Sequence, residues 1–219
     1  GQSNTDIPGF GTSYVDIDAE ETELQFRVSP NLGVNLRQVV SALNRYPYGC
    51  IEQTSSGLRG VIAFADVNGL SQNVKKKINA GIDRILAKQK SSGAFGYWSK
   101  YSSVYNRYQP YAIDTLQKSL AYAMDRDKVV AAISDGLEYL YRNDLDDPLD
   151  QLYAYGLLAR SGYEVTSRAR YVIDQELKLD ELITKVVANS FNIDGFLDEL
   201  ALAYWVSINI GCLLYTSDA

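Results

Sequence analysis

The period of the apolar residues changes near residue 35, and this change restricts the fold more than any other feature of the sequence. Before it, apolar and polar residues alternate in the segments 14–18 and 24–28, and a period of two is typical of half-buried strands. After it, apolar residues recur at every third or fourth position, as they do on one face of a helix. Because two short strands cannot form a stable sheet alone, we interpret residues 1–30 as the remnant of a preceding β domain.

Apolar stripes at helical spacing predict a succession of helices after this change. Turns rich in Gly, Asn and Asp separate the stripes. A helix with one apolar stripe must bury that stripe against a neighbour, so we predict an all-α array of helical hairpins. The stripes are Val39, Leu43, Tyr46; Leu58, Val61, Ile62, Ala65; Val74, Ile78, Ile82, Ile85; Ile113, Leu116, Leu120, Ala123; Val130, Ile133, Leu137, Tyr141; Leu149, Leu152, Leu157; Val172, Ile173; Leu182, Val186; and 196–205.

The charge distribution argues against a nucleic-acid partner. The formal net charge is −6, and no basic face of the kind that contacts phosphates is visible. The basic run Lys75, Lys76 and Lys77 falls on a predicted helix, and we interpret it as a solvated face. No apolar stretch reaches the roughly 18 residues of a membrane span, so we expect no direct membrane contact from these residues.

The cysteines and the absence of histidine limit the chemistry. The last eight residues, 212–219, resemble the translation of a transposon-end adapter used to prepare sequencing libraries. We therefore interpret Cys212 as foreign and expect the natural chain to continue differently beyond residue 211. This leaves Cys50 without an intrachain disulfide partner. With one credible cysteine and no histidine, a zinc site has too few ligands, and we expect no metal or cofactor.

Cys50 and Gln53 are spaced for a reaction between their side chains. Residues three apart lie on neighbouring faces of a helical turn, so the sulfur can approach the carboxamide carbon. Attack there with loss of ammonia closes a macrocyclic thioester, an acyl group stored for transfer to a nucleophile. Pro47 and Gly49 shape the entry to this ring through a fixed φ and a permissive φ respectively. The same pair also fits a small buried hydrophobe beside a surface amide, and spacing alone does not separate the two interpretations.

The residues around Cys50 carry a family resemblance. Segment 46–55 reads Tyr-Pro-Tyr-Gly-Cys-Ile-Glu-Gln-Thr-Ser and resembles the thioester signature of the α2-macroglobulin and complement family. The aliphatic Ile51, where vertebrate members carry Gly, is similar to the bacterial branch. The resemblance implies that Cys50 supplies the sulfur and Gln53 the acyl carbon. It also implies that Glu52 is a supporting acid at the start of the helix.

A second segment supports the first. Residues 89–98 contain Gln-x-x-x-Gly-x-Phe-Gly-Tyr-Trp, which resembles a turn that links helices in the thioester domain of this family. We expect Gly93 and Gly96 to make the bend, and Phe95 and Trp98 to be packing residues.

The resemblance also implies a domain organisation. The family's thioester domain is an α/α toroid, a ring of inner and outer helices, which interrupts a CUB-like β domain. We interpret residues 31–211 as such a toroid without its last helices, and residues 1–30 as the CUB-like remnant. Tyr46 and Tyr48 are candidates for shielding the thioester from water, although core packing explains them equally well.

The function that the resemblance implies is broad-spectrum endopeptidase inhibition by a protease trap, not turnover catalysis. In such a trap, cleavage of a bait region outside this chain exposes the thioester, and Gln53 acylates a lysine amine of the attacking protease. Some complement relatives transfer the acyl group through a histidine, which this sequence lacks, so we predict direct attack by amines. The expected partners are proteases and other domains of the same long chain. The expected location is the bacterial periplasm, where relatives are often lipid-anchored to the inner membrane.

Two other functions remain open from the sequence. Terpene cyclases and prenyltransferases share α/α barrels, and Asp144-Leu-Asp-Asp147 resembles the acid motif of one cyclase class, with Asp146 as the acid. Such an acid needs a buried carboxyl with a raised pKa, whereas clustered acids before Pro148 are also ordinary turn and helix-start residues. The third function is a binding module with a degenerate thioester site. The presence of both Cys50 and Gln53 favours a working site over that function.

Overall fold

The computed structural model describes residues 49–178, 181, 184 and 197–210. The chain divides into two units, Gly1–Asn35 and Leu36–Ala219, and all of the described residues belong to the second. The predicted strands, the stripe at Val39, Leu43 and Tyr46, and the 212–219 tail therefore lie outside the described residues. Tyr46 and Tyr48 lie outside them as well.

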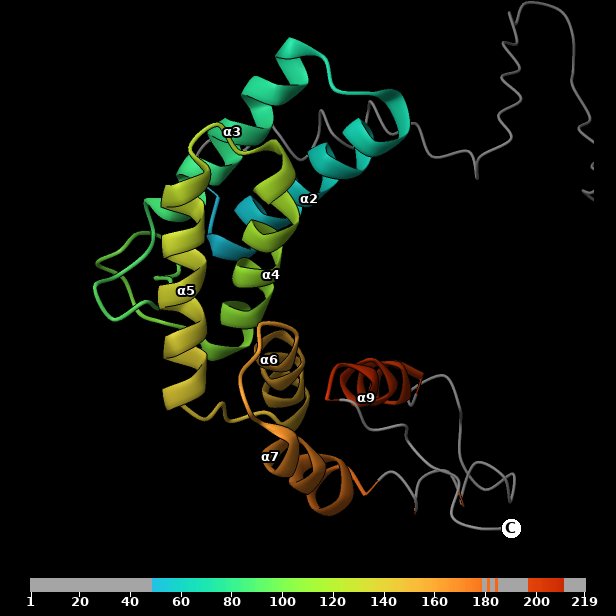
Figure 1. The fold of residues 1–219 in the computed structure, drawn as a ribbon. Coiled ribbons are helices and arrows are strands. Elements are labelled where there is room, and N and C mark those ends of the chain that lie inside the picture. Colours follow the sequence, from blue (N-terminus) through green and yellow to red (C-terminus); the bar gives the residue numbers. More distant parts are fainter. Residues whose placement is uncertain (1–48, 179–180, 182–183, 185–196, 211–219) are drawn as a thin grey trace, which may run out of the picture. The chain divides into compact units, whose positions relative to one another are not determined.

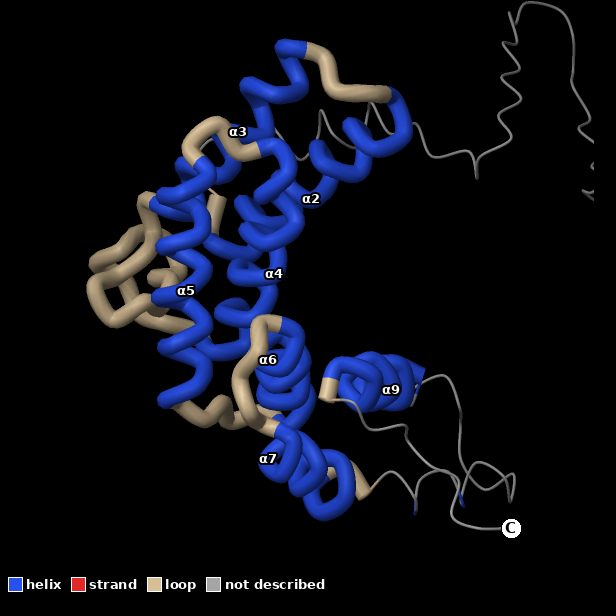
Figure 2. The backbone as a smooth tube through the Cα atoms, in the orientation of Figure 1, coloured by secondary structure: helices blue, strands red, loops and turns tan. Residues whose placement is uncertain are grey.

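The described part of the chain is built from helices joined by loops, and it contains isolated β-bridges but no strand (Figures 1 and 2). The all-α prediction is confirmed, whereas closure into a toroid stays a prediction. The α-helices are α2 (Ile51–Asn68), α3 (Gln72–Leu86), α4 (Gln109–Ser119), α5 (Arg126–Arg142), α6 (Pro148–Arg160), α7 (Thr166–Tyr171) and α9 (Leu197–Asn209). Short 3₁₀ turns, η1 (Asn106–Tyr108) and η2 (Leu120–Tyr122), flank α4, and a π-helical turn, η3 (Val172–Glu176), continues α7.

Side-chain caps set the starts of several helices. Ser71 accepts a hydrogen bond from the Val74 N–H (3.3 Å) at the start of α3. Asp125 accepts one from the Lys128 N–H (3.1 Å) at the start of α5. These caps satisfy N–H groups that have no partner within the helix. The polar turns that the sequence places between the apolar stripes therefore also begin the helices that follow them.

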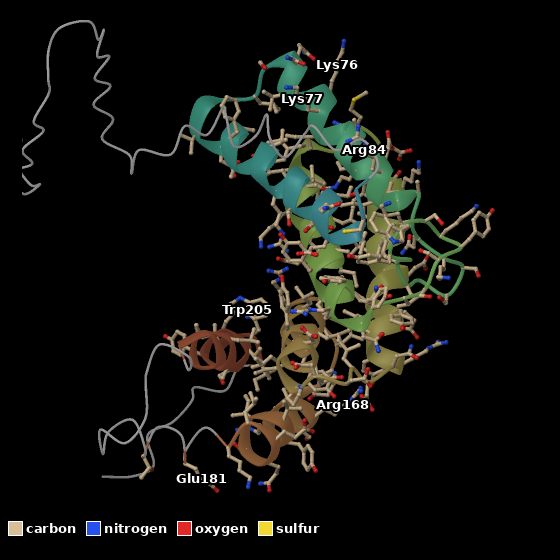
Figure 3. All side chains as sticks on the ribbon, turned by 180° about the vertical axis from the view of Figure 1, so that it is seen from behind. Lys76, Lys77, Arg84, Arg168, Glu181 and Trp205 are labelled. Carbon is tan, nitrogen blue, oxygen red and sulfur yellow. The ribbon has the colours of Figure 1, made fainter. Side chains whose placement is uncertain are left out.

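Helices α4 and α6 lie at the centre of the packing. Helix α4 contacts α2, α3, α5 and α6, and α6 contacts α4, α5, α7 and α9. Both helices bury residues around most of their circumference, polar ones included. At the contact between α6 and α9, a Cβ on Gly156 would lie 2.0 Å from the Trp205 ring, so only glycine fits there. Trp205 is labelled on α9 in Figure 3. Lys76 and Lys77 on α3 are exposed (Figure 3), as their interpretation as a solvated face predicts, whereas Lys75 is half-buried.

The predicted core face of α5 is partly wrong. Val130 and Tyr141 are 46% and 38% exposed, so neither belongs to the core. Helix α5 approaches α4 at Gly136, where an added Cβ would meet Ile113 Cγ1 at 2.8 Å. This close approach turns a neighbouring face inward, and a glycine carries no hydrophobicity signal that would reveal it. The buried α5 residues are Val129, Ala132, Ile133, Gly136, Leu137 and Leu140.

Candidate thioester site at Cys50

Cys50 lies at the start of α2, where the extended backbone turns into helix. It is the N-cap residue, with φ −61° and ψ 175°. Its N–H donates a hydrogen bond to Gln53 Oε1 (3.2 Å), and its side chain faces the Gln53 N–H, which completes a capping box. Cys50 is 1% exposed, while Gln53 is exposed. The two side chains thus share one helical turn, with the sulfur inside the protein and the amide at its surface.

Gly49 makes room for this turn. A Cβ on Gly49 would lie 3.1 Å from Gln53 Cβ and 3.3 Å from its Oε1. The Thr54 hydroxyl donates to the Gly49 carbonyl oxygen (3.1 Å) and fixes this approach. Gly49 is therefore needed because the Gln53 side chain packs directly against its Cα.

Glu52 is exposed in the first turn of α2. Burial raises the pKa of the Tyr108 phenol, and the charge of Glu52 and a hydrogen bond to it raise that pKa further. An acid at this position also interacts favourably with the positive end of the helix dipole. Glu52 thus connects the helix start to an aromatic side chain at the end of η1.

The loop between α3 and η1 lies against Cys50. The Ile51 N–H donates to the Tyr97 carbonyl oxygen (2.8 Å), which joins this loop to the first residue of α2. Hydrogen bonding to the Cys50 side chain, together with burial, raises the pKa of the Tyr97 hydroxyl to about 12. The loop therefore supplies a hydroxyl to the sulfur as well as a carbonyl to the helix start.

Aromatic rings gather on this loop around Tyr97. The Tyr97 ring meets the rings of Tyr105 and Trp98 edge to face, with centroids 4.8 Å and 5.1 Å apart. It stacks on Tyr108 with a centroid separation of 5.7 Å. Trp98 is 59% exposed, so it contacts Tyr97 but is not a buried packing residue.

The remaining predicted roles in segment 89–98 are confirmed. Gly93 has φ +89°, and a Cβ there would lie 2.1 Å from the Asp135 carbonyl oxygen. Phe95 is fully buried. Both backbone groups of Phe95 bond the buried Gln109 side chain, through the Phe95 N–H (2.7 Å) and the Phe95 carbonyl oxygen (2.9 Å). Gly96 makes a second tight bend, because a Cβ there would lie 2.0 Å from the Ser99 carbonyl oxygen.

Comparisons with known proteins place the described segment among bacterial relatives. No family model matches the chain. Over 168 residues the chain is 30% identical to α2-macroglobulin of Escherichia coli K12, an alignment that covers 71% of this chain and 10% of that protein. The chain is α2-macroglobulin-like. It spans about a tenth of the length of this curated relative.

Solved structures extend the likeness to the fold of the α2-macroglobulin-like chain. The crystal structure of Salmonella α2-macroglobulin reacted with methylamine matches with a TM-score of 0.51 and 26% identity, covering 63% of this chain and 10% of that one. The crystal structure of native E. coli α2-macroglobulin from domain MG7 to the C-terminus matches with a TM-score of 0.56 and 22% identity, covering 81% and 29%. The described helices therefore have the fold of a segment of bacterial α2-macroglobulins.

The acidic turn of the α2-macroglobulin-like chain does not form a cyclase acid. Asp147 caps α6, and its Oδ1 accepts the Leu149 N–H (2.8 Å). Asp144 pairs with Arg168 (2.9 Å). Asp146 is exposed, and it does not line the pocket of about 440 Å³ beside this turn. The turn interpretation is confirmed, because a protonating acid needs a buried carboxyl in a cavity.

Sequence reasoning missed three residues that shape the site. Gln109 holds the Phe95 backbone, the Tyr97 hydroxyl bonds the Cys50 side chain, and Lys88 is buried next to the loop. Tyr97 lies within the recognised turn motif and Lys88 directly precedes it, and this proximity is the one signal that the sequence offers for them. Gln109 begins α4 with no local pattern that distinguishes it from a surface glutamine.

Proposed function

We propose that Cys50 and Gln53 form an internal thioester, and that the parent protein uses it to capture attacking proteases covalently. The observation that carries this proposal is the shared helical turn, in which a buried cysteine caps the helix and its N–H holds the Gln53 carboxamide oxygen. The likeness to E. coli α2-macroglobulin supports the proposal at the level of the protein.

Formation of the ring is a substitution at the Gln53 carboxamide. The Cys50 sulfur adds to the carboxamide carbon, the C–N bond breaks, and the nitrogen leaves as ammonia with the thiol proton. The Cys50 N–H bond to Oε1 holds the carbonyl oxygen where negative charge develops during this addition. The same donor polarises the thioester carbonyl once the ring has formed.

Opening of the ring transfers the acyl group to an amine. An amine nitrogen bonds to the Gln53 acyl carbon, the C–S bond breaks, and the sulfur leaves as a thiolate. The methylamine-reacted Salmonella relative supports an amine as the nucleophile. A lysine amine of a protease held in the trap is the biological counterpart, and it needs no histidine relay.

The burial of the two partners suits a stored electrophile. The sulfur is inside the protein, and Gly49 and Ile51 on either side of it are buried. Gln53 faces outward, so an approaching amine reaches the acyl carbon from the surface. We further propose that this acyl carbon is covered by another part of the parent protein until a protease cleaves it, and that the protein acts in the periplasm.

The test is the intact mass of the gently purified parent protein, before and after treatment with methylamine. We expect a mass lower than the sequence by one ammonia, replaced after treatment by a methylamine adduct on Gln53 and one newly titratable thiol on Cys50. Gln53→Glu is the matched control, because a carboxylate of the same shape has no ammonia to lose. A parent protein with no deficit and a free thiol from the start would refute the thioester and favour the binding-module function.

A second readout tests the capture of proteases. An endopeptidase mixed with the parent protein should become covalently attached in a denaturing gel, and Cys50→Ser should abolish the attachment. Attachment that persists in Cys50→Ser would mean that capture does not use this site.

A further inference from the structure

Lys88 is a buried cation without a carboxylate partner. It is 9% exposed, and its ammonium donates to the Trp98 carbonyl oxygen (2.7 Å). None of the ion pairs among the described residues includes it. Burial accordingly lowers the pKa of the Lys88 ammonium. Because a buried charge with only a neutral partner is costly, its position calls for a function.

The loop is bonded both to the Lys88 ammonium and to the start of α2. The Tyr97 carbonyl oxygen accepts the Ile51 N–H (2.8 Å), and the next carbonyl along the chain, that of Trp98, accepts the Lys88 ammonium. The Lys88 carbonyl oxygen accepts the Gly96 N–H (2.9 Å), which fixes the lysine backbone to the same loop.

A negative charge on the Cys50 side chain would raise the pKa of the Lys88 ammonium, against the effect of burial. A Cys50 sulfur in a thioester is neutral, whereas the sulfur that leaves when the thioester opens is an anion. Lys88 therefore gains its counter-charge only during the reaction.

We propose that Lys88 is the counter-ion of the Cys50 thiolate released when the thioester opens, and that the Tyr97 hydroxyl donates a second contact to that sulfur. This inference rests on the thioester proposed above. As the amine nitrogen bonds to the Gln53 acyl carbon, the electron pair of the breaking C–S bond moves onto the sulfur. The proton of the acylated nitrogen passes to water. Interactions that are stronger in the transition state than in the ground state raise the rate, and the ammonium beside the sulfur is such an interaction.

The test measures acyl transfer in the parent protein with the charge removed or kept. Lys88→Met keeps much of the side-chain volume and removes the charge, Lys88→Arg keeps the charge, and Lys90→Met is the control on the same loop. Each variant is analysed by intact mass, and the rate of methylamine incorporation is followed by the appearance of the Cys50 thiol. We expect Lys88→Met to retain the ammonia deficit and to react about tenfold more slowly. Lys88→Arg and Lys90→Met should stay within about twofold of the unaltered protein.

The outcomes separate this inference from the thioester itself. An unaltered protein without an ammonia deficit refutes the thioester. If Lys88→Met keeps the mass deficit of one ammonia and incorporates methylamine at an unchanged rate, the counter-ion role is overturned and the thioester proposal stands. The counter-ion role is also overturned if the unaltered protein keeps the ammonia deficit after methylamine treatment and yields a Lys88–Gln53 cross-linked peptide. Lys88 has then acted as the nucleophile.

Lys88→Arg and one further variant, Tyr97→Phe, keep the test decisive if Lys88→Met forms no thioester. If Lys88→Arg shows the ammonia deficit that Lys88→Met lacks, the charge of residue 88 acts on the sulfur. If both variants lack the deficit, Lys88 acts through packing and the inference is overturned. Tyr97→Phe removes only the hydroxyl at the sulfur from a partly exposed ring, and it should slow methylamine incorporation about threefold. An unchanged rate in Tyr97→Phe would remove Tyr97 from the proposal.

Discussion

Replacing Asp114 with asparagine should lower the free energy of unfolding more than replacing the exposed Asp144 with asparagine. The Asp114 side chain is 3% exposed. It accepts hydrogen bonds from Arg59 (2.8 Å), Lys118 (2.5 Å), Arg160 (2.9 Å) and the Tyr153 hydroxyl (2.8 Å). These partners come from α2, α4 and α6, so one carboxylate joins three helices.

The magnitude follows from the burial of this network. Removing one partner of a buried ion pair costs about 3–5 kcal/mol. Asparagine retains one oxygen that can accept from the cations, but it leaves three positive groups around a neutral side chain. We therefore expect Asp114→Asn to lower the free energy of unfolding by about 3 kcal/mol, the lower end of that range.

The matched control is an exposed ion pair of similar length. Asp144 pairs with Arg168 at 2.9 Å, but the Asp144 side chain is 79% exposed. Exposed pairs contribute up to about 1 kcal/mol, so Asp144→Asn should cost less than that. Urea unfolding followed by circular dichroism measures both variants against the unaltered protein. Equal losses for the two variants would refute the reasoning, because burial would then not decide the cost.

Three more predictions follow from the geometry. Gly49→Ala places a Cβ 3.1 Å from Gln53 Cβ, so intact mass should show a smaller fraction with the ammonia deficit; an unchanged fraction would contradict the packing role of Gly49. Gly93→Ala combines a φ of +89° with a 2.1 Å contact to the Asp135 carbonyl oxygen and should cost about 3 kcal/mol or more in urea unfolding; a loss below about 1 kcal/mol would mean that the loop relaxes freely. Burial acts to raise the pKa of Asp114, but hydrogen bonds from its cationic and phenolic neighbours outweigh burial and lower it. The stability that this carboxylate contributes is therefore complete above the unfolded pKa of about 4 and is lost as the pH falls through the lower folded value. Acid unfolding of Asp114→Asn should accordingly depend less on pH below about 4 than that of the unaltered protein, and parallel curves would contradict this.

The helical period of the sequence predicts most of the described core. The stripes at Leu58, Ile78 and Ile113 are buried as expected, because an amphipathic helix in a globular protein turns its apolar stripe inward. The spacing of Cys50 and Gln53 also places both on one turn, since residues three apart in a helix are neighbours. These are local relations, and the sequence contains all the information that they need.

Relations between distant segments depend on tertiary packing. The inward face of α5 depends on how closely α4 approaches Gly136, and the exposure of Trp98 depends on which side of its loop faces solvent. Neither is encoded in a local period.

The helical class, the helix starts at polar caps and the position of Cys50 at a helix start all follow from the amino-acid sequence alone. The surroundings of that cysteine follow only from the way the chain packs. Lys88 and Tyr97 lie 38 and 47 positions further along the chain than Cys50, and the loop that begins after α3 is joined to the start of α2 by the backbone hydrogen bond from Ile51 to Tyr97. Charge and hydrogen bonding act through space and fall off with distance. The residues that act on the sulfur are therefore fixed by packing, not by their order in the sequence.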